Sequence, residues 1–237
     1  MCGIAGILTR DGAPGPDPRG VSESLLAALA HRGPDDRGLA EIRAGGTHGL
    51  LAHTRLAILD LSSAGHQPMS NPGTGDLLTL NGEIYNFRSL RAQLPEPWRS
   101  TSDGEVLLKG YAAWGRGVLE RLRGMFAFGL WDARRQELFL ARDRFGIKPL
   151  YYVAGNGFFA FASEVRALLS AGLAKPELDP DGLWSFLGYQ APAAPSTLIR
   201  GIRSLPAGSW LSVGRGGELR SGTYWDLHTA AQATRDD

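Results

Sequence analysis

The only cysteine among the 237 residues is Cys2, which directly follows Met1. If the initiator methionine is removed, Cys2 carries both a thiol and a free α-amino group. A thiol is a good nucleophile, but only a few per cent of it is thiolate at neutral pH, so it needs a proton acceptor nearby. An α-amine with an ordinary pKa of about 7.7–8.0 can accept that proton at working pH. The first two residues therefore indicate nucleophilic catalysis, whereas the plain alternative is that a lone cysteine is a small buried apolar side chain.

One arginine, Arg55, interrupts the strand-like apolar stretch between Ala52 and Leu59. A lone arginine on a strand commonly occupies a solvated edge position. An arginine flanked by apolar neighbours is harder to leave in water, and a half-buried guanidinium can bind a carboxylate with two parallel hydrogen bonds. Arg55 is therefore a candidate carboxylate-binding residue.

Two further polar positions stand at the ends of predicted elements. Asn81-Gly82-Glu83 follows the strand-like residues 77–80, and Asn-Gly is foremost a turn dipeptide. The chemical alternative is that the Asn81 amide and the Gly82 N–H point the same way and form a two-donor hole for an oxyanion. Asp103 precedes a helical pattern over residues 106–114, so it is an N-cap candidate. The alternative is that it faces a substrate ammonium, and the pattern leaves both readings open.

The elements that must position these residues are short hairpin strands and helices. A buried strand is predicted over residues 4–8, and Asp17-Pro18 predicts the start of a helix that runs to Leu29. Hairpins are predicted about Gly45-Gly46, about residues 133–136 and about residues 155–157. Since the hairpin strands are largely apolar on both faces, their sheets should be covered on each side. The pattern predicts an α+β sandwich of two antiparallel sheets with outer helices.

Composition limits the classes of function. Hydrophobic residues make up 43% of the chain and the net charge is +1, so nothing favours binding to nucleic acid or to an anionic membrane. No apolar run predicts a signal peptide or a membrane span. One cysteine allows no internal disulfide, which suits the cytoplasm. The length fits one globular unit of roughly 170 residues plus an appendage.

Taken together, these residues and their surroundings resemble the glutaminase domain of glutamine-dependent asparagine synthetases. These are class II glutamine amidotransferases with the N-terminal-nucleophile hydrolase fold. The resemblance is carried, in order along the chain and together with the Ser102-Asp103 pair, by MCGIAGI, HRGPDD, HTRLAILDLSSAGHQPM, LNGEIYNFRSLR, RGMFAFGLWD, ARDRFGIKPLYY and FASEVRALL. It implies a four-layer αββα sandwich of two antiparallel sheets.

The resemblance also implies a role for each candidate residue. Cys2 would attack the side-chain amide of L-glutamine, and Asn81 and Gly82 would hold the oxyanion. Arg55 would bind the substrate α-carboxylate, while Glu83 and Asp103 would bind its α-ammonium. Leu56 and Ile58 would add backbone contacts. The products would be glutamate and ammonia, with no metal and no cofactor in this half. Ala57 and Gly104 depart from the family pattern beside binding residues.

The synthetase half of these enzymes carries an ATP-pyrophosphatase loop, Ser-Gly-Gly-x-Asp-Ser, which does not occur in this sequence. ATP and Mg²⁺ are therefore expected only at an absent synthetase domain or subunit, the predicted partner. We expect a glutaminase domain over residues 1–177, with its sandwich complete at about residue 169, and a connector over residues 178–237. The apolar residues between positions 183 and 227 would either dock that partner or cap the sandwich as an extra layer. A homodimer is also compatible with the sequence. The alternative function is a catalytically idle module that docks on or regulates a synthetase.

Overall fold

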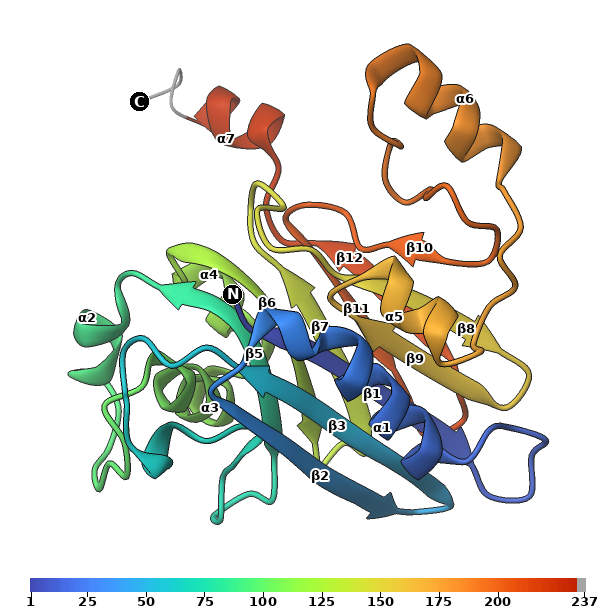
Figure 1. Ribbon diagram of the computed structural model, residues 1–237. Coiled ribbons are helices and arrows are strands. Elements are labelled where there is room, and N and C mark those ends of the chain that lie inside the picture. Colours follow the sequence, from blue (N-terminus) through green and yellow to red (C-terminus); the bar gives the residue numbers. More distant parts are fainter. Residues whose placement is uncertain (234–237) are drawn as a thin grey trace.

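Hairpin strands build two six-stranded antiparallel sheets, which stack face to face in the computed structural model (Figure 1). The structure describes residues 1–233. The first sheet has the order β10 (Arg203–Ser204), β8 (Tyr151–Gly155), β9 (Phe158–Ala162), β1 (Gly3–Arg10), β3 (Thr47–Arg55) and β2 (Asp36–Ala44). The second sheet has the order β12 (Leu219–Thr223), β11 (Ser209–Val213), β7 (Glu137–Arg142), β6 (Gly124–Asp132), β5 (Leu77–Ile84) and β4 (Met69–Ser70). The three predicted hairpins are present as β2–β3, β6–β7 and β8–β9.

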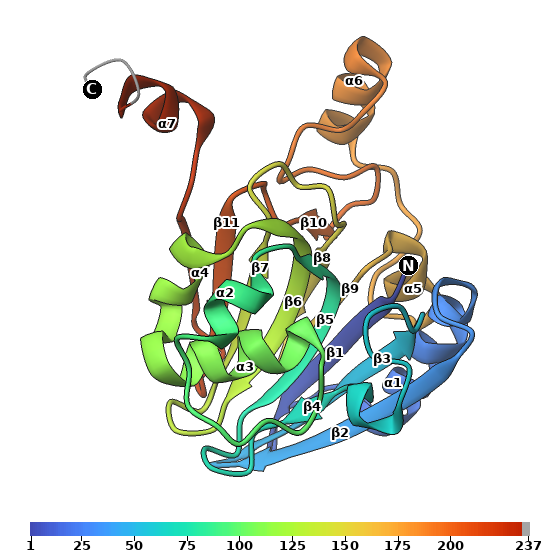
Figure 2. The same cartoon turned by 90° about the vertical axis from the view of Figure 1, so that its left-hand side faces the viewer.

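Helices cover the outer face of each sheet (Figure 2). The first sheet is covered by α1 (Pro18–Leu29) and α5 (Val165–Ser170), and the second by α2 (Phe87–Arg91), α3 (Asp103–Trp114) and α4 (Val118–Arg121). Short 3₁₀ turns lie at η1 (Ala30–Arg32), η2 (Ser63–Gly65) and η3 (Gly115–Gly117). The four-layer αββα sandwich is confirmed, and so is the predicted start of α1. Asp17 caps that helix by accepting a hydrogen bond of 2.8 Å from the N–H of Gly20.

Three apolar layers hold the sandwich together. Between the sheets, Ile4 and Leu51 of the first pack in one cluster with Leu140 of the second. Between α1 and the first sheet, Leu25 packs with Ile7. Burying each such side chain fully is worth roughly 1.5–3 kcal/mol. The first strand is therefore buried on both faces, whereas Met1, two residues before it, is exposed.

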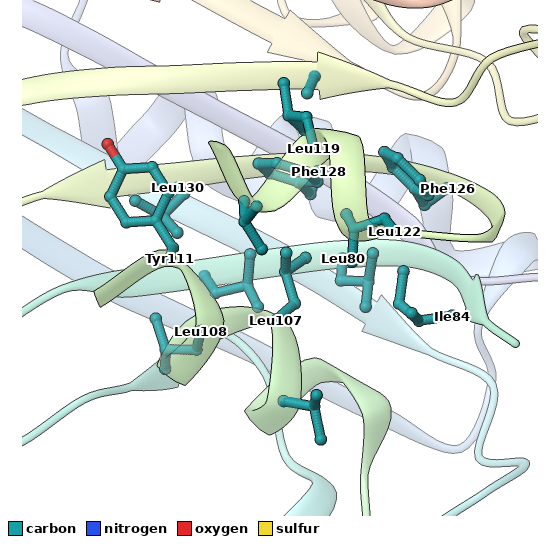
Figure 3. Packing of buried hydrophobic residues seen from close by; sticks show 14 of the residues in the cluster. Leu80, Ile84, Leu107, Leu108, Tyr111, Leu119, Leu122, Phe126, Phe128 and Leu130 are labelled. Atoms are coloured by element: carbon teal, nitrogen blue, oxygen red, sulfur yellow. The ribbon is translucent and has the colours of Figure 1, made fainter. Parts of the chain in front are cut away.

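The third apolar layer lies between the second sheet and its helices (Figure 3). Leu107 and Leu122, from the helical region, pack in one cluster with Leu80 and Phe126 from the sheet. Tyr111 also lies in this layer, and its buried hydroxyl donates a hydrogen bond of 3.0 Å to Asp132. This packing fixes α3 against β5, the two elements that carry Asp103 and Asn81.

The sandwich continues beyond residue 177, where the sequence suggested that a connector begins. Strand β11 pairs with β7, from Trp210 opposite Ala141 to Val213 opposite Leu138. Leu211 and Val213 are buried in the cluster between the sheets. The expectation that the sandwich is complete near residue 169 was wrong, because these apolar strand residues complete the second sheet instead of capping it.

Two helices near the end of the described chain stand away from the sandwich in both views (Figures 1 and 2). They are α6 (Pro180–Tyr189) and α7 (Leu227–Ala233). Trp184 on α6 is 80% exposed, and Leu187 and Tyr189 are also largely exposed. Among residues 1–233, no helix is long and apolar enough to cross a membrane.

Candidate active site

All eight residues predicted for the site line a single pocket of about 190 Å³. They are Cys2, Arg55, Leu56, Ile58, Asn81, Gly82, Glu83 and Asp103. The pocket lies where the start of β1, the end of β3, the end of β5 and the start of α3 meet. Pairing of Gly3 with Thr54 in the first sheet places Cys2 next to the residues that follow β3.

The thiol of Cys2 lies against the backbone of Leu56. Its Sγ accepts a hydrogen bond from the Leu56 N–H at 3.4 Å and donates to the Leu56 carbonyl at 3.6 Å. Burial raises the pKa of the Cys2 thiol, while the Leu56 N–H and the positive charges of the amino terminus, Arg55 and Arg32 oppose this rise. Because the net shift is upward, the thiol needs a proton acceptor to become a nucleophile at neutral pH.

The side chain of Asn81 is 1% exposed, and its Nδ2 has no hydrogen-bond partner in the described structure. An unpaired buried amide donor costs free energy. Because this donor lies in a pocket, it indicates that an atom of a bound ligand accepts its hydrogen bond. The neighbouring strand β6 lies close to Gly82. A Cβ at Gly82 would collide with the Met125 carbonyl oxygen and lie 2.6 Å from the Phe126 Cα. Only glycine fits there without displacing β6.

The turn reading of Asn81-Gly82 was wrong. Both residues continue β5, pairing with Ala127 and Phe126 of β6. The dipeptide is extended because β6 offers it a full ladder partner, which a local turn propensity does not outweigh. As a result, Asn81 sits in the interior of a sheet and not at a flexible bend.

Arg55 is the last residue of β3 and is buried. Its guanidinium donates hydrogen bonds to two loop carbonyls, those of Asp60 and of Ser62, the latter at 3.1 Å. Gly65 packs directly against it, and any Cβ there would clash with the guanidinium. No carboxylate in residues 1–233 lies within ion-pair distance of Arg55. The pocket therefore contains a buried positive charge that a ligand carboxylate would neutralise.

Asp103 does not cap α3, so that prediction was wrong. The N-cap is Ser102, whose Oγ accepts a hydrogen bond from the Gly104 N–H at 3.0 Å. The buried carboxylate of Asp103 instead accepts a hydrogen bond of 2.8 Å from the Ile84 N–H. Burial raises the pKa of Asp103, the Ile84 N–H opposes that rise, and the negative charge of Glu83 adds to it. A cation placed beside these two carboxylates would be favoured by both of them.

Among the other pocket residues, three with charged or amide side chains were not singled out from the sequence: Asp60, Gln67 and Lys148. Hydrogen bonds from the Ser62 hydroxyl and the Thr101 N–H, at 2.6 and 2.8 Å, lower the pKa of Asp60 to about 2. Asp60 therefore ties the loop after β3 to the segment before α3. Gln67 accepts a hydrogen bond of 2.6 Å from the Leu80 N–H, next to Asn81. The Asp-Leu-Ser sequence that begins at Asp60 was a local signal for this residue, whereas nothing in the sequence marked Gln67 or Lys148.

No group of three or more His, Cys, Asp or Glu side chains that could hold a metal ion occurs within the described part of the chain. The pocket is instead built from a thiol, an amide, a guanidinium and carboxylates. These groups suit the binding of a zwitterionic amino acid whose side chain carries the reacting carbonyl.

Two stacked antiparallel sheets between helical layers, with Cys2 directly before the inner strand β1, form the αββα sandwich expected of the N-terminal-nucleophile hydrolase fold. The sequence model of the family described as "Glutamine amidotransferase domain" matches residues 1–225. The chain belongs to this family.

Two curated relatives agree with this assignment, and a solved structure shares the fold. A putative glutamine-hydrolysing asparagine synthetase of Mycobacterium bovis is 39% identical over 230 residues, covering 90% of this chain and 35% of that protein. Glutamine-hydrolysing asparagine synthetase 3 of Bacillus subtilis is 36% identical, over 87% of this chain and 34% of that protein. A B. subtilis glutamine phosphoribosylpyrophosphate amidotransferase structure has a TM-score of 0.68 at 20% identity, over 95% of this chain and 50% of that one. The chain thus spans about a third of the length of these curated relatives.

Proposed function

We propose that this domain hydrolyses L-glutamine to glutamate and ammonia through a γ-glutamyl thioester on Cys2, and that the ammonia serves an ATP-dependent, amide-forming synthetase domain or subunit. The observation that carries the proposal is the unpaired, buried Nδ2 of Asn81 in the same pocket as the Cys2 thiol. A donor held ready without a partner is what an oxyanion hole requires.

The reaction begins at the α-amine of Cys2, which requires that Met1 has been removed. This amine accepts the thiol proton, and Sγ attacks the side-chain amide carbon of glutamine. The tetrahedral oxyanion is held by the Asn81 Nδ2 and the Gly82 N–H. Collapse of this intermediate breaks the C–N bond, and the ammonium of Cys2 returns the proton so that ammonia leaves. Water then attacks the thioester, with the same amine as base, and glutamate is released.

The charged ends of the substrate match the charged walls of the pocket. Arg55 binds the α-carboxylate, and the absence of an ion pair to Arg55 within residues 1–233 supports this role. Glu83 and Asp103 bind the α-ammonium. Leu56 and Ile58 contribute backbone contacts that fix the distance between these charges and Sγ. The alternative, an idle module, has no explanation for eight pocket residues that together fit one amino-acid substrate.

The partner proposal rests on length and on the relatives. The chain spans about a third of proteins named as glutamine-hydrolysing asparagine synthetases. ATP and Mg²⁺ would act in the synthetase part, outside this chain, and the amide acceptor is aspartate or another carboxylate. We assign the enzyme to the cytoplasm because the mechanism needs a reduced Cys2.

A direct test is glutamate release by the chain with Met1 removed, as verified by intact mass. We expect turnover with glutamine, and almost none when Met1 or one added residue precedes Cys2, because the nitrogen of Cys2 is then a peptide nitrogen and not a base. A matched preparation with the same residue added after Asp237 should remain active. Full turnover by the chain that retains Met1 would show that the base lies elsewhere.

The docking surface predicted for residues 183–227 comprises only the residues that the structure leaves exposed, which lie chiefly on α6. We expect Trp184→Ser combined with Leu187→Ser to weaken binding to the cognate synthetase while leaving glutamate release unchanged, because this face lies outside the pocket. The matched control is Leu219→Ser, an exposed apolar position on β12. Co-sedimentation and ATP-dependent amide formation measure the two effects. Undiminished binding in the double variant would contradict docking at α6.

A further inference from the structure

Lys148 is a buried cation in the candidate active site for which the proposed reaction has no role. Its side chain lines the pocket together with Cys2, and the residue is only 6% exposed. A lysine ammonium has three donors, and a buried one is normally paired with a carboxylate. In residues 1–233, no carboxylate lies within ion-pair distance of Lys148. An unpaired buried charge is costly, so this placement calls for a functional reason.

Hydrogen bonds within the loop between β7 and β8 hold the backbone of Lys148 in place. Both oxygens of the buried Asp143 carboxylate accept backbone hydrogen bonds from this loop, at 3.1 Å from Phe145, 3.0 Å from Ile147 and 3.0 Å from Lys148 itself. Arg142 donates to the Lys148 carbonyl at 2.7 Å. The neighbouring Arg and Asp of the ARDRFGIKPLYY segment thus clamp the Lys148 backbone from both sides.

The Nζ of Lys148 lies beside the first residue of the chain. It is 3.5 Å from the Sδ of Met1, which also lines the pocket. Removal of Met1 takes this contact away and leaves the Cys2 α-amine at the start of the chain, in the pocket that Cys2 and Lys148 both line. The ammonium of Lys148 then shares this pocket with a second nitrogen that would become a cation if it were protonated.

We propose that Lys148 is a positioning residue whose ammonium keeps the Cys2 α-amine in its unprotonated form, ready to act as the base. This proposal rests on the proposed function. Two like charges close together in a partly buried site disfavour each other, so a fixed cation favours the neutral amine. An ordinary α-amine is substantially protonated at neutral pH, and a protonated amine cannot accept the thiol proton.

The other charges around Cys2 leave this role open to Lys148. Arg32, on η1, donates to the Cys2 carbonyl at 2.9 Å but is paired with Glu164 at 2.9 Å. Arg55 faces the site from β3 and is neutralised when the substrate carboxylate arrives. The acids across the pocket are Asp60, Glu83 and Asp103, from the loop after β3, from β5 and from α3. These carboxylates would favour a protonated amine, and Lys148 opposes them.

The pH dependence of kcat/KM tests the proposal, with Met1 removed from every variant. In Lys148→Met we expect the acidic limb to move upward by about one pH unit, because loss of the cation raises the pKa of the amine. The rate should fall more at neutral pH than on the alkaline plateau. Lys148→Arg, which keeps the charge, should remain near the wild-type limb. Lys175→Met, at an exposed lysine outside the pocket, is the matched control.

A second readout does not depend on turnover. The rate of acetylation of the Cys2 α-amine, followed against pH by peptide mass mapping, gives the amine pKa directly, and this pKa should rise in Lys148→Met. Lys148→Gln serves the same purpose if the methionine variant does not fold. An unchanged acidic limb and amine pKa overturn the proposal, and so does an equal shift in Lys148→Arg, which would indicate packing. A wild-type chain that releases no glutamate overturns the proposed function itself, and this inference with it.

Discussion

Glutamate release is expected to fall by about 10⁴-fold or more in Cys2→Ala, because no other thiol in the sequence can form the acyl-enzyme. A diazoketone analogue of glutamine should label the wild-type chain once and leave Cys2→Ala unlabelled. The melting temperature should change little, since the thiol makes only weak, long hydrogen bonds to Leu56. Thermal melting, glutamate release and intact mass therefore separate a lost nucleophile from a lost fold.

The matched control for this result is Cys2→Ser, which keeps size and polarity but replaces the thiol by a hydroxyl of much higher pKa. We expect a fold as stable as that of the wild type and a rate far below it. Labelling that persists in Cys2→Ala would place the nucleophile at another residue and remove the basis of the proposed thioester.

The second large effect is expected at Asn81. In Asn81→Ala, kcat should fall by about 10²–10³-fold while KM changes little, because the lost donor serves the oxyanion more than the ground-state amide. The melting temperature should stay the same or rise, because the removed Nδ2 is a buried donor without a partner. When a functional group destabilises the fold, its removal should lower the rate without lowering the melting temperature.

Arg55→Lys provides the contrast to Asn81→Ala. It keeps the charge but loses the planar fork that binds a carboxylate with two hydrogen bonds, so it should chiefly raise KM. Steady-state kinetics on both variants measures the split. If Asn81→Ala chiefly raised KM and Arg55→Lys chiefly lowered kcat, the two assignments would be exchanged or wrong.

Local chemistry explains why much of the structure was accessible from the sequence. Apolar strands separated by two glycine-containing turns and one polar turn predicted three hairpins, and two-sided apolar strands predicted a sandwich with outer helices. Asp17 and Pro18 marked the start of α1, because a cap depends on only a few adjacent residues. The residue types at positions 2, 55 and 81–82 marked candidate reactive groups before any geometry was available, and the family resemblance added Glu83.

Tertiary structure decided what depends on partners distant in the chain. The pairing of β5 with β6 turned Asn81-Gly82 from a turn into buried strand, and β11 completed the second sheet where the sequence suggested a connector. The Asp103 carboxylate accepts a hydrogen bond from the Ile84 N–H, while Ser102 is the N-cap of α3.

Within residues 1–233, the lack of a hydrogen-bond partner at the Asn81 Nδ2 and of a carboxylate partner at the Lys148 ammonium is likewise a property of the assembled pocket. A sequence specifies which donors and charges exist, and local propensities specify the elements that carry them. Whether a donor is satisfied or a charge neutralised depends on groups brought together from far along the chain, so only the packed structure decides it.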